Sequence, residues 1–357
     1  MDWYALARPL VWRFDPERAH HAAIAALKTG LVPGCRGADD PILRTQVCGL
    51  DLANPVGLAA GFDKDAEVPD AMLAQGFGFV ETGTVTPLPQ PGNPKPRLFR
   101  LEEDAAVVNS FGFNSKGLAA YGARLQARAG RPSRGPVGAN VGKNKASTDA
   151  VADYVKGVEA TARFADYLVV NISSPNTPGL RALQARETVR ALMQAVIEAR
   201  ARSVGESGRR PPLWVKIAPD LDDAGLADVA EEALATGVDG IVLGNTTVTR
   251  PPTLRSVHRT RPGGLSGRPL KSLAAERLAA LYRITGGRIP LIGCGGIESG
   301  ADAYARLRAG ASAVQLYSAL VYHGPGLAER IKRELAACLR ADGFASVAAA
   351  VGADHQG

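Results

Sequence analysis

The stretch Tyr-Leu-Val-Val-Asn-Ile-Ser-Ser-Pro-Asn (167–176) joins four apolar residues to a polar, proline-containing loop. A short apolar run bounded by such a loop is typical of a buried β-strand. The two asparagine amides and two serine hydroxyls therefore gather where the strand ends, and they can hydrogen-bond a small polar ligand. A single loop of this kind is equally typical of a turn that caps the next helix. The arrangement recurs at other strand ends in the chain, and this repetition favours a ligand site.

Eight short apolar runs, separated in the later part of the chain by alanine-rich helical stretches, predict an α/β fold. The strands are expected at 55–60, 79–82, 137–141, 168–172, 213–217, 240–243, 290–293 and 313–316. The helices are expected at 188–202, 222–236, 270–285 and 301–309. This alternation favours a parallel (β/α)8 TIM barrel over an open sheet, and 357 residues suit one barrel with additions. The first strand lacks a glycine-rich dinucleotide fingerprint, which argues against a Rossmann domain.

Two long insertions interrupt the repeat. Residues 85–116 hold five prolines between Pro87 and Pro96, followed by a predicted hairpin at 97–101 and 106–109. Residues 244–269 are rich in Arg, Pro, Thr and Gly. Both insertions follow barrel strands, so we expect them at the rim of the barrel, where barrel enzymes carry their sites.

The first 30 residues predict two short amphipathic helices, the second beginning at Asp15-Pro16-Glu17 and ending near Lys28. One interpretation is a pair of helices that simply packs on the main domain. The other is a membrane-surface anchor, with aromatic residues and three arginines at the interface: Arg8, Arg13 and Arg18. We expect a helical extension over 1–38, a barrel over 39–341 and an alanine-rich tail over 342–357, which is either a short helix or disordered.

The composition of the chain argues against several classes of function. The net charge is +7, from 42 basic and 35 acidic residues that are spread along the chain, and we expect no nucleic-acid partner. Four cysteines without metal-like spacing suggest a reducing compartment. The sequence shows neither a secretory signal nor an apolar run of membrane-spanning length. We expect no metal site, because no cluster of His, Asp and Glu is apparent.

Residues at the predicted strand ends indicate an organic cofactor with a phosphate. Lys64 follows the first strand, and Lys216 lies inside the strand at 213–217, where an unpaired cation would be costly. Gly-Cys-Gly-Gly (293–296) and Tyr-Ser (317–318) end the last two strands, where barrels commonly bind phosphate. With no catalytic metal or nucleophile triad predicted, a bound cofactor must carry the chemistry, and flavin mononucleotide (FMN) meets these demands.

Seven motifs, in the same order along almost the whole chain, resemble those of the dihydroorotate dehydrogenase family. They are Ala-Ala-Gly-Phe-Asp-Lys (59–64), Glu-Thr-Gly-Thr-Val-Thr-Pro (81–87), Asn-Ser-Phe-Gly-Phe-Asn (109–114), Asn-Ile-Ser-Ser-Pro-Asn-Thr (171–177), Gly-Leu-Ser-Gly-Arg-Pro (264–269), Gly-Cys-Gly-Gly-Ile (293–297) and Gln-Leu-Tyr-Ser-Ala (315–319). Ser174, where the soluble branch of the family has Cys, and the N-terminal helices resemble the membrane-associated, quinone-reducing branch.

The resemblance implies a set of site residues. Ser174 would be the catalytic base, and Arg100 would contact quinone. The dihydroorotate contacts would be Lys64, Asn109, Ser110, Phe111, Gly112, Phe113, Asn171, Asn176, Asn245 and Thr246. The FMN contacts would be Ala60, Thr84, Asn140, Asn171, Lys216, Gly244, Gly267, Gly296, Tyr317 and Ser318. Gly244 departs from the family pattern, in which Thr is expected, so only its backbone could serve.

The implied reaction is the oxidation of dihydroorotate to orotate in pyrimidine biosynthesis. Ser174 would take the proton from C5 while C6 passes a hydride to the flavin, and Lys64 would hold the substrate carboxylate. Quinone would reoxidise the flavin from beneath the N-terminal helices. We expect a monomer, peripheral to the cytoplasmic side of the cell (inner) membrane.

Three rival functions remain at this point. A soluble FMN-dependent pyrimidine or dihydrouridine oxidoreductase would need a nicotinamide partner or a basic RNA surface. A phosphate-binding barrel without redox chemistry would leave the asparagines unused. A membrane-bound scaffold would not need lysines at strand ends. A flavin spectrum would exclude the last two, and stimulation by quinone but not by NAD would exclude the first.

Overall fold

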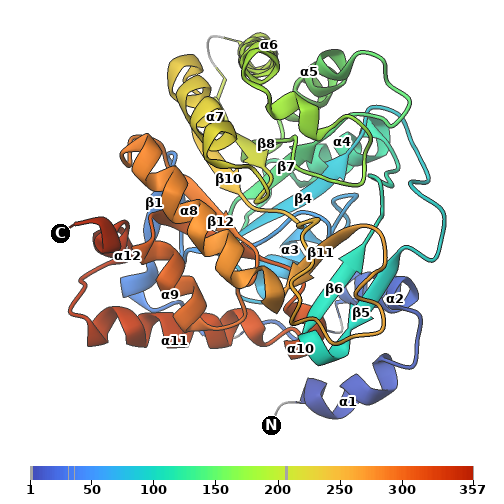
Figure 1. Ribbon diagram of the computed structural model, residues 1–357, viewed down its shortest axis with the longest axis vertical. Helices are drawn as coiled ribbons and strands as arrows, with labels where there is room; N and C mark the ends of the chain where they lie inside the picture. Colours follow the sequence, from blue (N-terminus) through green and yellow to red (C-terminus); the bar gives the residue numbers. More distant parts are fainter. Residues whose placement is uncertain (1–2, 31, 36, 206–207, 357) are drawn as a thin grey trace.

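Eight parallel strands close into a barrel in the computed structural model, which describes residues 3–30, 32–35, 37–205 and 208–356. In order around the barrel they are β3 (Val56–Leu58), β4 (Phe79–Val85), β7 (Val137–Val141), β8 (Tyr167–Asn171), β9 (Leu213–Ile217), β10 (Gly240–Leu243), β12 (Leu291–Cys294) and β13 (Ala311–Leu316). Each predicted strand coincides with one of these (Figure 1). The predicted TIM barrel is confirmed.

The helices that follow the barrel strands form the outer layer. They are α3 (Pro69–Ala74), α4 (Leu118–Arg128), α5 (Ala150–Thr161), α6 (Arg186–Val204), α7 (Asp223–Thr236), α8 (Lys271–Thr285), α9 (Gly300–Arg308), α10 (Leu320–His323) and α11 (Leu327–Ala341). The four helices predicted from alanine-rich stretches are α6 to α9. Their buried faces and the outward side chains of the strands make one continuous apolar cluster, which buries the largest part of the core.

A second, smaller core fills the inside of the barrel and closes the end at which the strands begin. Tyr167 stacks on Trp214 with ring centroids 4.3 Å apart, and Phe79 meets the Trp214 ring edge-on. The hairpin of β1 (Thr45–Val47) and β2 (Leu50–Leu52) packs its apolar residues against these rings. Aromatic side chains therefore plug one end of the barrel, and residues at the other end, where the strands terminate, line a cavity.

The two insertions meet above that open end. The predicted hairpin is present as β5 (Leu98–Leu101) and β6 (Ala106–Asn109). The second insertion supplies β11 (Gly264–Gly267), which pairs antiparallel with β6, so the hairpin becomes a three-stranded sheet. This third strand was not predicted. Figure 1 shows the sheet beside the barrel mouth, near both N-terminal helices.

The N-terminal helices are α1 (Trp3–Val11) and α2 (Pro16–Lys28), as predicted. Asp15 caps α2 by accepting a hydrogen bond of 3.0 Å from the Arg18 amide. Helix α2 contacts β5 and α3, and α1 lies against α10, where Arg8 donates to the Tyr322 carbonyl oxygen. Among the described residues, no helix combines the length and apolar character needed to cross a bilayer.

The alanine-rich tail is folded. It forms α12 (Val347–Ala350) and a 3-10 turn at Ala353–His355. The His355 ring stacks on Tyr282 of α8 with centroids 4.9 Å apart, and Asp354 pairs with Arg308 of α9. These contacts hold the tail against the barrel's outer helices.

Candidate active site

A cavity of about 630 Å³ opens at the ends of the barrel strands and continues beneath α2. Most of the residues expected at the site line it: Ala60, Lys64, Thr84, Arg100, Asn109, Phe111, Gly112, Phe113, Asn171, Ser174, Asn176, Lys216, Asn245, Thr246, Gly267, Gly296, Tyr317 and Ser318. Three do not line it: Ser110, Asn140 and Gly244. The structure thus brings 18 predicted residues from distant parts of the chain around one space.

Glu81 accepts hydrogen bonds from three polar side chains, of which Lys216 lines the cavity. Its Oε1 accepts from Lys216 Nζ at 2.9 Å and from Asn140 Nδ2 at 2.6 Å, and its Oε2 accepts from Gln315 Nε2 at 2.6 Å. Glu81 and Gln315 are fully buried, and Lys216 is 2 % exposed. Glu81 was not predicted as a site residue. The sequence did contain a hint: one acidic residue lies in a predicted buried strand, and one lysine lies in another, so the two could pair inside the barrel.

A chain of amides and hydroxyls rises from this group toward the open end. Thr84 donates to Asn140 Oδ1 at 2.5 Å and accepts from Asn171 Nδ2 at 2.9 Å. Asn171 Oδ1 in turn accepts from the Ser173 hydroxyl, which also accepts from Asn245 Nδ2 at 2.8 Å. Asn140 therefore acts on the cavity through Thr84 and Glu81. The ends of four strands are cross-linked in one fixed polar surface.

The loop that follows β8 carries Ser174 into the cavity. Ser174 is 7 % exposed, and its Oγ accepts from the Asn176 amide at 3.3 Å. Asn176 Nδ2 donates to two oxygen atoms of Asn109, the backbone carbonyl oxygen at 3.1 Å and the side-chain Oδ1 at 3.2 Å. Thr246 Oγ1 is buried without a hydrogen-bond partner in the described structure, so it remains available to a polar ligand.

Lys64 enters the same space from the loop after β3. Its Nζ lies 3.4 Å from the centre of the Phe111 ring and donates to Asn114 Oδ1 at 2.6 Å. Burial, assisted by the charge of Arg97, lowers the pKa of Lys64 to about 7. No carboxylate among the described residues pairs with Lys64 Nζ, so an anionic ligand would stabilise its charged form.

Two glycines after β12 allow the backbone to approach a ligand. Gly295 and Gly296 have φ of +111° and +70°, and a Cβ on Gly296 would lie 2.4 Å from Lys271 Cα. Close packing against the start of α8 therefore excludes side chains and leaves the amides open, as phosphate-binding turns require. Beside them, the Ser318 hydroxyl lies 2.7 Å from that of Ser266 on β11.

Gly244 is constrained differently. Its φ is +122°, and a Cβ there would lie 1.9 Å from the Cys294 carbonyl oxygen. The backbone of this chain cannot accept the threonine expected from the family pattern without moving.

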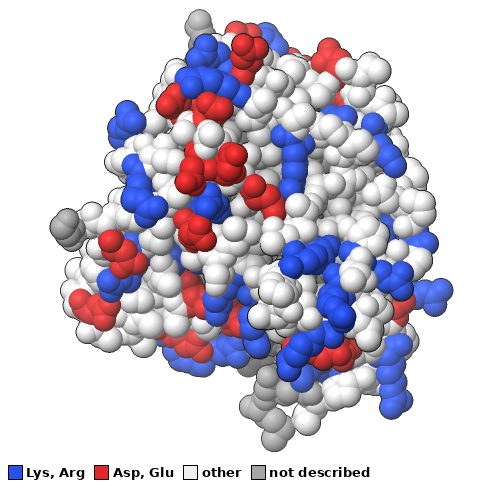
Figure 2. All heavy atoms as spheres, viewed as in Figure 1, with Lys and Arg blue, Asp and Glu red and all other residues white. Residues whose placement is uncertain are grey.

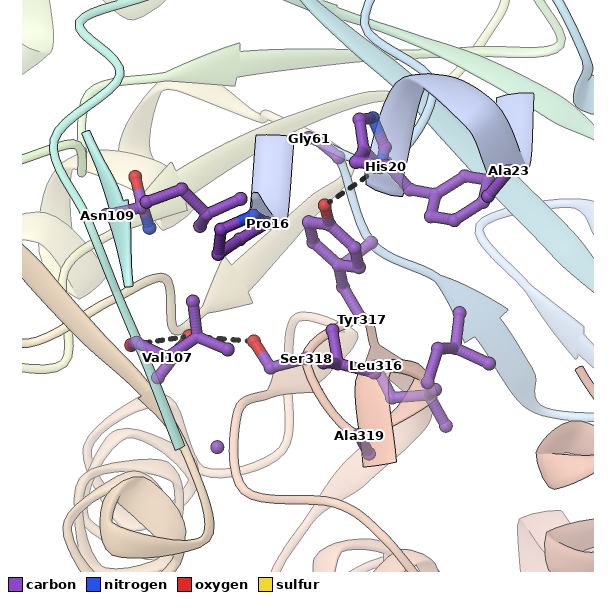
Figure 3. A pocket seen from close by; sticks show the side chains of 18 of the residues that line it. Pro16, His20, Ala23, Gly61, Val107, Asn109, Leu316, Tyr317, Ser318 and Ala319 are labelled. Atoms are coloured by element: carbon purple, nitrogen blue, oxygen red, sulfur yellow. Dashed lines mark hydrogen bonds between the residues drawn. The ribbon is translucent and has the colours of Figure 1, made fainter. Parts of the chain in front are cut away.

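The far wall of the cavity is helix α2. His20 faces Tyr317 with Nδ1 3.5 Å from its hydroxyl (Figure 3). The His20 ring also packs edge-on against Phe62. Burial, with the charge of Lys64, lowers the pKa of His20 to about 4, so the ring is neutral. Arg100 of β5 donates to the carbonyl oxygens of Trp12 and Phe14, and all three residues line the cavity. The sequence analysis did not single out His20, because a histidine on a short helix has no distinguishing pattern.

Comparison with known proteins agrees with this geometry. The sequence profile of the dihydroorotate dehydrogenase family matches residues 42–339. The chain is 64% identical over 355 residues to "Dihydroorotate dehydrogenase (quinone)" of Xanthobacter autotrophicus, covering 99% of both chains. It is 48% identical to the mitochondrial "Dihydroorotate dehydrogenase (quinone)" of Oryza sativa, covering 98% of this chain and 80% of the relative.

Solved structures give the same result. The crystal structure of the Eimeria tenella enzyme in complex with ferulenol superposes with a TM-score of 0.94 at 44% identity, covering 98% of this chain and 99% of that one. A barrel with this site and these relatives defines a flavoenzyme of the dehydrogenase type. The chain belongs to the dihydroorotate dehydrogenase family, in its quinone-dependent class.

Proposed function

We propose that this chain, an oxidoreductase of the quinone-dependent dihydroorotate dehydrogenase class, binds FMN in the cavity and uses the residues described above. When bound, FMN would accept a hydride from dihydroorotate and deliver the electrons to quinone. The observation that supports this best is the shape of the site. One cavity joins a polar, serine-bearing chamber at the strand ends to an apolar passage under α2.

The residues fit FMN at both of its ends. The backbone amides at Gly295 and Gly296, with the Ser318 hydroxyl, suit the phosphate. Thr84, Asn171 and Lys216 suit the polar edge of the ring system, and Ala60, Gly267 and Tyr317 line the walls. We therefore propose that the expected FMN-binding residues that line the cavity contact FMN directly. Asn140 would act through Thr84, and Gly244 would contribute only its backbone.

Dihydroorotate would lie between Ser174 and Lys64. Lys64 would bind its carboxylate, and the amides of Asn109, Asn171, Asn176 and Asn245 with Thr246 would pair with the ring's polar edges. Phe111, Gly112 and Phe113 would cover it, while Ser110 supports them from outside the cavity. Ser174 would accept the C5 proton as orotate forms, and burial in a loop fixed by Asn176 orients its hydroxyl for this transfer.

Quinone would enter through the passage under α2, where Arg100 is the polar group proposed to meet its head. Leu6 and Leu10 of α1 and the neighbouring Phe14 are more than half exposed, and Arg13 and Arg18 are exposed beside them. Lysine and arginine side chains also gather on the face that carries β5, β6 and α1 (Figure 2). These features support peripheral binding to an anionic membrane surface.

We further propose an oligomeric state, a location and a division into domains. The chain would act as a monomer on the cytoplasmic side of the cell (inner) membrane. Residues 1–38 would form the quinone and membrane unit, 39–341 the FMN barrel and 342–357 the tail.

The purified full chain tests the function directly. It should carry a flavin spectrum, bleach when mixed with dihydroorotate, and recover its absorbance when a quinone is added, but not with NAD⁺. Recovery with NAD⁺ instead of quinone would favour a soluble nicotinamide-linked oxidoreductase. A colourless protein that binds no FMN would overturn the proposal.

A further inference from the structure

Glu17, in the first turn of α2, is a buried carboxylate. It is 5 % exposed and accepts from Arg97 through Nη2 at 2.8 Å and Nε at 3.2 Å, with Lys95 Nζ at 3.3 Å. Burial acts to raise the pKa of Glu17, but Arg97 and Lys95 outweigh it, and the pKa lies below its usual value. An ionised, two-pronged pair therefore fastens α2 to the segment just before β5.

Arg97 also holds the loops that enclose the substrate chamber. Its Nη1 donates to the carbonyl oxygens of Pro91 (2.6 Å) and Asn93 (2.8 Å), and its own carbonyl accepts from the Ser110 amide at 2.9 Å. The guanidinium lies over Phe111, 5.3 Å from the ring centre. The Arg97 guanidinium thus links α2 to the carbonyl oxygens of Pro91 and Asn93 and to the Phe111 ring.

Phe111 connects Arg97 to Lys64, because its ring contacts both side chains. The ring is in contact with Lys64 Nζ at 3.4 Å, and the Phe111 carbonyl accepts from the Asn93 amide at 2.9 Å. If the Arg97 side chain shifts, the loop and the lysine must shift with it, because packed contacts transmit displacement. A contiguous path therefore runs from Glu17 on α2 through Arg97 and Phe111 to Lys64.

We propose that Glu17 is a positioning residue for dihydroorotate, acting through Arg97 on the Phe111 loop and Lys64. The inference rests on the proposed function, in which that loop and lysine bind the substrate. Its consequence is that the helix covering the quinone passage also sets the affinity of the other substrate. Docking of α2 and binding of dihydroorotate are then energetically coupled, and each stabilises the other.

Glu17→Gln tests this with little change of shape. The amide keeps one acceptor but loses the charge, so the buried Arg97 is incompletely paired. We expect the orotate Kd, read from the flavin absorbance shift, and the dihydroorotate KM both to rise about tenfold, since hydrogen bonds to charged groups are worth roughly this factor. The rate of flavin reduction at saturating dihydroorotate should stay within about twofold of native. Glu17→Asp, which keeps the charge on a shorter arm, should give a smaller rise.

Lys28→Met is the matched control, at the opposite end of the same helix. Lys28 pairs with Glu67 at 3.0 Å and lies outside the cavity lining, so it also ties α2 to the barrel but does not touch the Phe111 loop. Its orotate Kd should equal that of the native chain. An unchanged Kd in both Glu17 variants, or an equal rise in Lys28→Met, would overturn the inference. Failure of the native flavoprotein to bind orotate would instead overturn the proposed function.

Discussion

Lys216 Nζ lies 2.9 Å from Glu81 Oε1, and both side chains are almost completely removed from solvent at the centre of the barrel. Burial acts to lower the pKa of Lys216, but the negative charge of Glu81 outweighs it, and the pKa is raised. Lys216 therefore carries its positive charge in the folded chain. The cation expected to meet the flavin is one half of a pair, and its field at the cofactor depends on the acid behind it.

Glu81→Gln should raise the midpoint potential of the bound flavin. Removing the negative charge leaves Lys216 less compensated, so the anionic reduced flavin is favoured. For a two-electron couple about 30 mV corresponds to 1.4 kcal/mol, and we expect a shift of a few tens of millivolts. Equilibrium dye reduction measures it. A potential that stays unchanged or becomes more negative would contradict the proposed contact between Lys216 and the flavin.

Lys216→Ala should be more damaging than the loss of a ligand contact alone. It leaves Glu81 buried and without its cation, which commonly costs about 3–5 kcal/mol. We expect a lower flavin content and a lower free energy of unfolding in denaturant titrations. Adding Glu81→Gln to Lys216→Ala should recover part of the stability but not the flavin affinity. Recovery of neither would mean that the two residues do not act as a pair.

Ser174→Ala should retain the flavin and the fold but reduce its flavin about 100- to 10,000-fold more slowly with dihydroorotate, because general base assistance is removed. Stopped-flow absorbance gives this rate without interference from quinone. Ser174→Cys should keep part of the activity, since a thiol can also accept the proton. A near-native rate of flavin reduction in the Ala variant would show that Ser174 is not the catalytic base.

Orotate affinity should fall as the pH rises above 7. Burial lowers the pKa of Lys64 to about 7 in the ligand-free chain, whereas a bound carboxylate favours the protonated amine. Binding is then strongest below pH 7, where Lys64 is already charged, and weakens by up to about tenfold per pH unit above it. Titrations between pH 6 and 9 measure the slope. Lys64→Gln, which cannot titrate, should bind orotate weakly and without this dependence.

Deleting residues 1–35 should leave a folded, yellow barrel that dihydroorotate still reduces. Reoxidation by a long-chain quinone and binding to anionic vesicles should both fall sharply, because α1 and α2 are lost. The two half-reactions are followed separately by stopped-flow absorbance. Saturating dihydroorotate is needed, since the deletion also removes the partner of Arg97. Native reoxidation rates in the shortened chain would show that the helices serve only packing.

The barrel could be predicted because each of its strands is a local apolar run with a turn at its end. The candidate site residues came from the family resemblance, and 18 of them line one cavity because parallel barrel strands deliver their ends to one place. The strand β11 could not be found in this way. Gly-Leu-Ser-Gly (264–267) has one apolar residue, and only pairing with β6 makes it a strand.

The missed residues depend on contacts through space. Glu81 and Gln315 are 234 positions apart, and Glu17 and Arg97 are 80 apart, yet each pair is hydrogen-bonded. Sequence reasoning marked Lys216 as a cation that needs an anion but assigned that anion to the cofactor. A partner inside the protein satisfies the same electrostatic requirement, so the pattern alone could not choose between them.

The sheet of β5, β6 and β11 also constrains the order in which the chain can be completed during synthesis. Ser266 and Val107 are hydrogen-bonded across 159 positions, and six of the eight barrel strands precede β11. Until the ribosome has released β11 and Leu254, the hairpin keeps one edge unpaired and its apolar residues Leu101 and Val108 uncovered. An unpaired edge with exposed apolar side chains invites association with other chains. The nascent protein is therefore open to misassembly at this sheet, whose residues later line the cavity at the strand ends.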